Sequence, residues 1–155
     1  MDIFKTATTD AGLSNDEIAS ALAQSLEGRT FTNKKVLIIP PDFTRYHSNA
    51  GFITCVYWKL LTARGVQVDV MPALGTHVPV SAEQWKVMFP DIPYGKMIVH
   101  GWRTDVVKLG DVPAEVVAEI TDGLWKEPVA VEVNRRIMDE TYDLIISPGQ
   151  VVPHE

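Results

Sequence analysis

The chain has 155 residues, the length of one ordinary domain, and its 46% hydrophobic and 22% charged residues exclude disorder, collagen-like repeats and a coiled coil. A net charge of −6 repels phosphate backbones and argues against a nucleic-acid partner. There is no signal-like amino terminus and no run of eighteen apolar residues, and the one cysteine, Cys55, cannot form an internal disulfide, so we expect a cytoplasmic protein without a membrane span.

The first half of the sequence alternates between helical and strand-like patterns. We expect a helix over 15–27, a strand over 35–39, a helix over 50–64 and a strand over 66–71. Ser14 and Glu17 have the spacing of a capping box, which marks the start of the first helix. The apolar run over 35–39 is continuous and ends at Pro40, which is typical of a central parallel strand covered on both faces.

The second half continues the alternation with a less regular pattern. We expect a helix that Ser81 caps and that ends before Pro90, a strand over 96–99, extended segments over 106–109, 114–120 and 129–133, a short helix over 134–140, and a buried strand over 143–147. This order predicts an α/β fold over 1–155 as a single domain, with a mainly parallel sheet and helices on both faces in a Rossmann-like three-layer arrangement. Ligands of such sheets bind at the carboxyl ends of the strands.

The loop after the first predicted strand carries two candidate ligand-binding residues. Asp42 is an acceptor, and Arg45 has the planar fork that holds a carboxylate through two hydrogen bonds. The structural alternative is a turn in which Asp42 accepts from local amides and Arg45 pairs with a surface acid.

Two histidines follow other strands at the same predicted edge. His77 lies after Gly75 in the loop that follows the second strand, and His154 lies at the tip of the loop after the last strand. An imidazole suits proton transfer because its ordinary pKa, about 6.5, is near neutrality. The alternatives are a solvated loop histidine for His77 and a frayed terminal residue for His154. A parallel sheet would nevertheless bring all these strand ends together.

The remaining histidines and the glycines carry no comparable signal. His100 follows a predicted strand but is interpreted as structural, and His47 as a polar loop residue. No short metal-ligand spacing occurs, and neither the dinucleotide-binding glycine pattern nor the P-loop is present. We therefore expect no metal site, and no ordinary dinucleotide or nucleoside triphosphate site, in these residues.

Four motifs together carry a family resemblance. They are Pro41-Asp42-Phe43-Thr44-Arg45, Leu74-Gly75-Thr76-His77-Val78-Pro79, Val133-Asn134-Arg135-Arg136 and Pro148-Gly149-Gln150-Val151-Val152-Pro153-His154. In order and spacing, the chain from Lys34 to Glu155 resembles the amino-terminal domain of the nickel-dependent lactate racemase family.

The resemblance implies an isomerase that racemises or epimerises a 2-hydroxy acid by proton-coupled hydride transfer to a nickel-pincer nucleotide, a cofactor derived from nicotinic acid. His77 and His154 match two histidines that alternate as base and acid on opposite sides of the substrate. Arg45 matches a residue that helps to hold the substrate. Asp42 matches its neighbour in the active site, and we expect it to orient Arg45 or an imidazole.

The resemblance also implies parts that this sequence does not contain. The family's covalent cofactor lysine, ten residues beyond the second histidine, a later nickel-ligating histidine and a carboxy-terminal domain would all lie beyond Glu155. We therefore expect the chain to be the amino-terminal part of a longer two-domain enzyme, inactive and without nickel when it is alone.

Two further hypotheses belong to other functional classes. One is a module that binds a small carboxylate or phosphate without chemistry, and the other is a scaffold in which the motifs only shape turns. A shared cleft for Arg45 and His77 would weaken the scaffold hypothesis, whereas positions at opposite ends of the sheet would refute both ligand-binding hypotheses.

Overall fold

The computed structural model describes residues 3–151 and divides into two compact units. Among the described residues, the first unit comprises residues 3–99 and 140–151, and the second comprises residues 100–139. Within residues 3–151, no helix has the length and apolar character needed to cross a membrane. A single domain over the whole chain stays a prediction.

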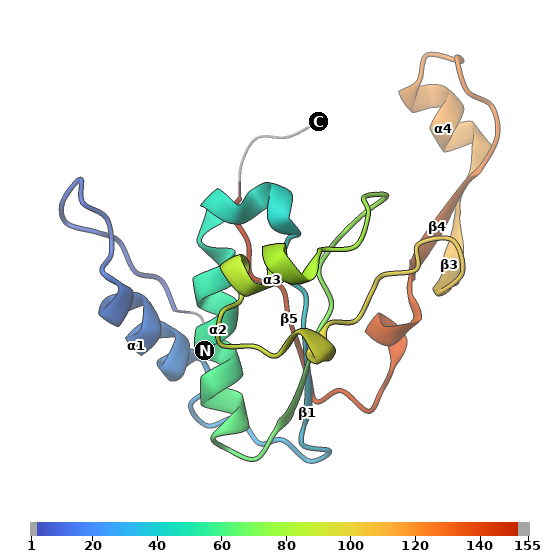
Figure 1. Cartoon of the computed structure of the whole chain (residues 1–155). Helices are drawn as coiled ribbons and strands as arrows, with labels where there is room; N and C mark the ends of the chain where they lie inside the picture. The colour runs from blue at the N-terminus through green and yellow to red at the C-terminus, as the bar shows by residue number, and fades with distance from the viewer. Residues whose placement is uncertain (1–2, 152–155) are drawn as a thin grey trace. The chain divides into compact units, whose positions relative to one another are not determined.

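The first unit contains three α-helices and a parallel sheet (Figure 1). Its elements are α1 (Asn15–Ser25), β1 (Lys35–Ile38), the 3-10 helix η1 (Phe43–Ser48), α2 (Ala50–Thr62), β2 (Gln67–Val70), α3 (Ala82–Met88), the 3-10 turn η2 (Tyr94–Lys96) and β5 (Leu144–Ile146). Both helices with predicted serine caps begin as expected, because Ser14 with Glu17 and Ser81 with Gln84 form complete capping boxes.

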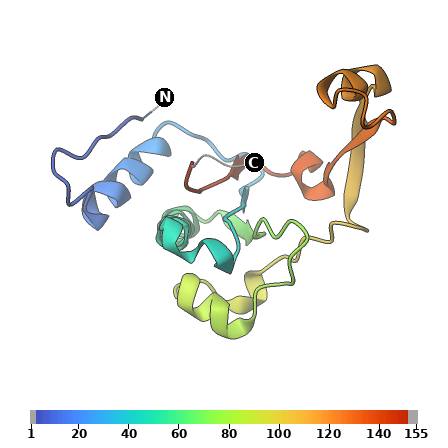
Figure 2. The ribbon, with the colours of Figure 1, turned by 90° about the horizontal axis from the view of Figure 1, so that it is seen from above.

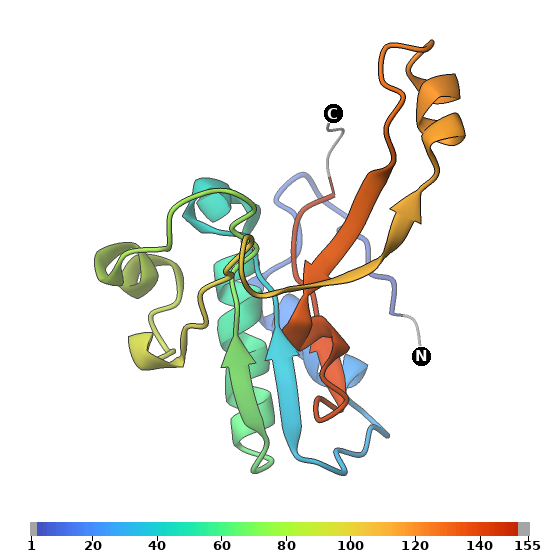
Figure 3. The same ribbon diagram turned by 90° about the vertical axis from the view of Figure 1, so that its right-hand side faces the viewer.

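The sheet has the order β2-β1-β5, and both pairings are parallel. Val36 of β1 pairs with Val68 on one side and with Leu144 on the other. Figure 3 shows β1 and β2 side by side with α2 behind them. Val36, Leu37 and Ile38 are fully buried. The predicted α/β fold, with a parallel sheet flanked by helices and a central strand after α1, is confirmed.

The large hydrophobic cluster covers one face of this sheet. Strand residues Val36, Ile38, Val68 and Val70 meet helix residues that include Cys55, Leu61, Trp85 and Met88. Seen from above, α1 and α2 lie next to each other on one side of the strands (Figure 2). The side chains that alternate along each strand therefore bury one full face against helices.

The other face carries a smaller cluster that comes from strand and loop residues rather than from a helix. Leu37 and Met71 pack there with Tyr142, against Ile39 and Ile98. The Tyr142 hydroxyl donates to Asp69 Oδ2 at 2.7 Å, so the carboxylate that β2 carries on this face is also bonded. Among the described residues, this smaller cluster is built from strand and loop side chains.

The expected strand over 96–99 is wrong. Lys96 ends η2, because its amide donates to the Pro93 carbonyl and the Met97 amide donates to the Tyr94 carbonyl. The segment meets the sheet through one isolated bridge of Met97 to Val70, in which the Ile98 amide donates to the Val70 carbonyl at 2.8 Å. The turn uses the hydrogen bonds that the first half of a strand would need.

The second unit is an antiparallel pair, β3 (Val106–Val112) with β4 (Val129–Asn134), joined through α4 (Ala114–Ile120). The extended segment expected over 114–120 is wrong, because it is this helix. Pro113 precedes it at a position where a missing amide costs nothing, and so short an apolar run does not distinguish helix from strand. The short helix expected over 134–140 is the 3-10 turn η3 (Arg135–Met138).

The close approach of α2 and α3 gives a stability prediction. A Cβ built on Gly51 of α2 collides with the backbone carbonyl oxygen of Met88, which cannot rotate away as a side chain can. We expect Gly51→Ala to lower the free energy of unfolding by about 1–3 kcal/mol in urea denaturation. Gly95→Ala is the matched control, since a Cβ there meets nothing within 4 Å. Equal stability of the two variants would contradict this packing.

Candidate active site

The loops that follow β1 and β2 stay side by side beyond the ends of the strands. Pro41 and Ala73 form a parallel bridge, and the Ala73 amide donates to the Pro40 carbonyl at 2.8 Å. The pairing of β1 with β2 therefore continues into the loops. It brings Asp42 and His77, which are 35 residues apart in the sequence, to one edge of the sheet.

Asp42 binds its own loop with one carboxylate oxygen and His77 with the other. Its Oδ1 accepts from the Thr44 amide at 3.1 Å and from the Thr44 hydroxyl at 2.5 Å, so Asp42 caps η1. Its Oδ2 accepts from His77 Nδ1 at 2.6 Å. The predicted turn role and the predicted imidazole-orienting role thus occur in the same side chain, which is only 6% exposed.

The pKa of Asp42 lies below its ordinary value. Burial alone would raise this pKa, but the hydrogen bonds from Thr44 and His77 outweigh the burial. The carboxylate is therefore ionised at neutral pH and acts only as an acceptor. It follows that His77 Nδ1 carries the proton, and that Nε2 is the nitrogen able to take up a proton from a ligand.

A tight turn holds the backbone of His77 and leaves its side chain exposed. The His77 amide donates to the Leu74 carbonyl at 2.9 Å, and Leu74 is buried in the main core. Gly75 has a φ of 54°, a left-handed conformation that glycine adopts without strain. The turn is thus anchored on one side, while the His77 side chain remains 58% exposed.

His77 and Arg45 line two different pockets that share the segment 41–45 as a wall. The first pocket, of about 270 Å³, is lined by Asp42, Phe43, Thr44, His77, Val78, Val80 and Gln84. The second, also of about 270 Å³, is lined by Ile39, Pro41, Arg45, His47, Ser48, Ala73 and residues 147–150. Arg45 and His77 therefore lie at the same end of the sheet, as predicted, but the single cleft that would weaken the scaffold hypothesis is not observed.

Of the other histidines, the structure describes His47 in the first unit and His100 in the second. His154 lies outside the described residues, so its convergence with His77 stays a prediction. His47 is exposed in η1 and lines the Arg45 pocket. His100 belongs to the second unit, where the Asn134 side-chain amide donates to its Nδ1 at 2.9 Å and to Asp105 at 3.3 Å. This network agrees with a structural role for His100.

Residues 3–151 do not supply a nickel site. Within them, no group of three or more histidine, cysteine, aspartate or glutamate side chains is arranged to hold a metal ion. The two donors at the strand ends, Asp42 and His77, are bonded to each other. A nickel-pincer nucleotide thus finds no ligand set among these residues.

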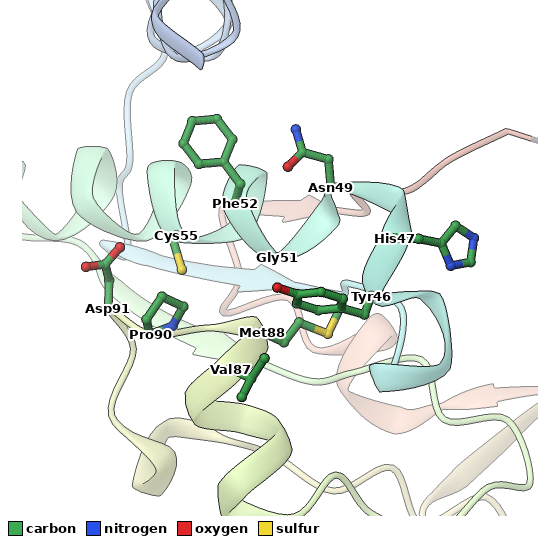
Figure 4. Close-up of a pocket in the computed structure, with 10 residues that line it drawn as sticks. All are labelled: Tyr46, His47, Asn49, Gly51, Phe52, Cys55, Val87, Met88, Pro90 and Asp91. Carbon is green, nitrogen blue, oxygen red and sulfur yellow. The ribbon is translucent and has the colours of Figure 1, made fainter. Parts of the chain in front are cut away.

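A third pocket, of about 520 Å³, lies between α2 and α3, and none of the predicted site residues lines it. Figure 4 shows Cys55 pointing from α2 into this space and His47 directed away from it. Burial raises the pKa of the Cys55 thiol, which keeps it protonated and unreactive. This pocket therefore does not include the Asp42–His77 pair at the strand ends.

The sequence interpretation missed two features of the site. It did not pair the Thr44 hydroxyl with Asp42, although an Asp followed two residues later by Thr is a common local capping pattern. It also missed Gln84, which lines the His77 pocket from α3. No sequence motif links position 84 to the two loops.

Comparison with known proteins gives both fold and family matches. The chain resembles a protein of known structure from Thermotoga maritima, with a TM-score of 0.79 and 22% identity over 93% of this chain and 34% of that one. It also resembles the lactate racemase apoprotein from Thermoanaerobacterium thermosaccharolyticum, with a TM-score of 0.54 and 17% identity over 84% of this chain and 31% of that one. The chain thus spans about a third of the length of these two proteins. No curated protein matches the sequence.

The family match extends over nearly the whole sequence. The lactate racemase N-terminal domain family (Lar_N) matches residues 6–155, which include both loops that carry Asp42 and His77. The structural likeness to a lactate racemase apoprotein agrees with this match. The chain therefore belongs to the lactate racemase N-terminal domain family.

Proposed function

We propose that this chain is the amino-terminal catalytic domain of a lactate racemase-like enzyme that racemises or epimerises a 2-hydroxy acid by proton-coupled hydride transfer. The family supports a racemase-like domain. The observation that carries the proposal is the hydrogen bond of 2.6 Å between the buried Asp42 carboxylate and His77 Nδ1. A histidine oriented in this way is a common arrangement for a general base.

His77 is proposed to act on the substrate hydroxyl through Nε2. Asp42 fixes the neutral imidazole in the form that has its lone pair on Nε2, and it stabilises the imidazolium that forms when the proton is taken up. Inversion of configuration needs a second proton acceptor on the opposite side of the substrate. We assign that role to His154, so that each histidine serves one enantiomer.

Arg45 is proposed to bind the substrate carboxylate. It extends from η1, three residues after Asp42, and lines the pocket beside the loop that leads toward His154. A guanidinium binds a carboxylate in a planar pair of hydrogen bonds and so fixes the direction of the rest of the substrate. The substrate would then lie across the segment 41–45, with its carboxylate in the Arg45 pocket and its hydroxyl in the His77 pocket.

The nickel-pincer nucleotide is proposed as the cofactor of a longer protein, bound by residues beyond Glu155. Bound there, it would supply the hydride acceptor of the reaction. The relatives of known structure are about three times as long as this chain, which supports a further domain. We further propose that the protein works in the cytoplasm, and that the 155-residue chain alone neither turns over substrate nor retains nickel.

Removal of the His77 imidazole tests the catalytic role. In the full-length protein loaded with cofactor, we expect His77→Ala to reduce interconversion of the enantiomers of a 2-hydroxy acid by at least about 10²-fold. Chiral chromatography of the products measures the rate, and circular dichroism checks that the variant is folded. Full activity of a folded His77→Ala protein would refute the role. Binding of small organic acids without any turnover by the unaltered protein would instead favour a binding module.

The lowered pKa of Asp42 predicts a pH-dependent contribution to stability. A carboxyl whose pKa is lower in the folded than in the unfolded state stabilises the fold above its unfolded pKa of about 3.9, and this contribution is lost as the pH falls through the lower folded value. We expect Asp42→Asn to cost about 2 kcal/mol in urea denaturation at pH 7 and markedly less at pH 3. Asp10→Asn, at an exposed turn position, controls for the lost charge. A cost that does not change with pH would contradict the role of ionised Asp42.

Replacement of the Arg45 fork tests the carboxylate-binding role. Arg45→Lys keeps the positive charge but loses the planar pair of donors. We expect KM for the hydroxy acid to rise about tenfold, with a smaller change in kcat. The reason is that the guanidinium would contact the carboxylate in the bound substrate as well as in the transition state. Steady-state kinetics in both directions measure this effect. An unchanged KM would show that another residue binds the carboxylate.

A further inference from the structure

Thr44 places two hydrogen-bond donors on one oxygen of Asp42. Its backbone amide and its hydroxyl both donate to Oδ1, at 3.1 and 2.5 Å, whereas His77 takes the other oxygen, Oδ2. Capping of η1 requires only the amide bond. The hydroxyl bond is therefore an additional contact, and it acts on the residue that orients His77.

We propose that Thr44 is a positioning residue of the active site: its hydroxyl fixes the plane of the Asp42 carboxylate, so that Oδ2 is directed at His77 Nδ1 and Nε2 faces the ligand. This inference rests on the proposed function for its catalytic meaning. The contacts that carry it are those between Thr44, Asp42 and His77.

The geometry explains why a hydroxyl at this position matters. A carboxylate is planar, so two donors that converge on Oδ1 restrict rotation of the group and determine where Oδ2 points. The Thr44 side chain is β-branched and has few rotamers, and its backbone is fixed in η1. The hydroxyl thus has a defined position even though the residue lies at the exposed surface of the loop.

Among the groups around Asp42, Thr44 contributes measurably to the lowering of the Asp42 pKa. His77 is the titratable group bonded to the carboxylate, and Gln84, which faces the same pocket from α3, is uncharged. Arg45 follows in η1 and lines the other pocket. Of the interactions that lower the pKa of Asp42, the side-chain hydrogen bond from Thr44 is larger than the one from His77, and together they outweigh burial. Thr44 therefore helps to keep Asp42 ionised and able to accept from His77.

The test removes only the hydroxyl. Thr44→Val keeps the amide, the β-branch and nearly the same volume, and Thr44→Ser restores a hydroxyl. Thr62→Val is the matched control, because Thr62 lies at the exposed end of α2 and its hydroxyl donates to the Trp58 carbonyl of its own helix.

In the 155-residue chain, carbon-detected NMR follows the Asp42 carboxyl through a pH titration, and nitrogen NMR identifies which nitrogen of neutral His77 carries the proton. We expect Thr44→Val to raise the Asp42 pKa by about one unit and to mix the two tautomers of His77. Thr44→Ser should return both readouts to those of the unaltered chain, and Thr62→Val should change neither. An unchanged Asp42 pKa and a single His77 tautomer in folded Thr44→Val would overturn the inference.

Kinetics of the full-length racemase separate this inference from the proposed function. If Thr44 positions the base, Thr44→Val lowers kcat about tenfold with little change in KM, and Thr44→Ser restores kcat. An unchanged kcat of Thr44→Val in an active enzyme would overturn the positioning role. If no form of the protein racemises any 2-hydroxy acid while the NMR effects occur, the proposed function fails and the positioning of His77 by Thr44 stands.

Discussion

The parallel pairing of β1 with β2 is the constraint on which the candidate site depends. Because the two strands run in the same direction, their carboxyl ends meet at one edge, and the bridge between Pro41 and Ala73 carries the pairing into the loops. The Asp42–His77 hydrogen bond is a consequence of this pairing. The buried residues of β1 supply the packing that holds both loops in place, so core and site share one structural origin.

Much of this arrangement could be predicted from local signals in the sequence. The serine caps of α1 and α3 and the apolar runs of β1, β2 and β5 each follow from a few neighbouring residues, and the structure contains all of them. The meeting of Asp42 with His77 followed from one further assumption, namely that these strands are parallel. Physical rules of short range, combined with one rule of topology, were therefore sufficient for the α/β fold and for this half of the site.

The features that could not be predicted depend on contacts distant in sequence. Met97 joins the sheet by one bridge because η2 uses the amides of Lys96 and of Met97 itself. The helical state of α4 is also not decided by its seven residues alone. Likewise, the residue types in the segment 41–45 do not reveal that its two ends line one pocket while its middle, residues 42–44, lines the other. Which side of a loop a side chain occupies is set by the elements packed around that loop, and no single motif records it.

The contact between Gly51 and Met88 has a consequence for the site as well as for the core. Helix α3 carries Gln84 into the wall of the His77 pocket, and the same helix rests on α2 where only a hydrogen atom separates position 51 from the Met88 carbonyl. The contact at Gly51 therefore fixes where α3, and with it Gln84, lies against α2. A residue that does not itself line the pocket in this way helps to place one of the side chains in its wall.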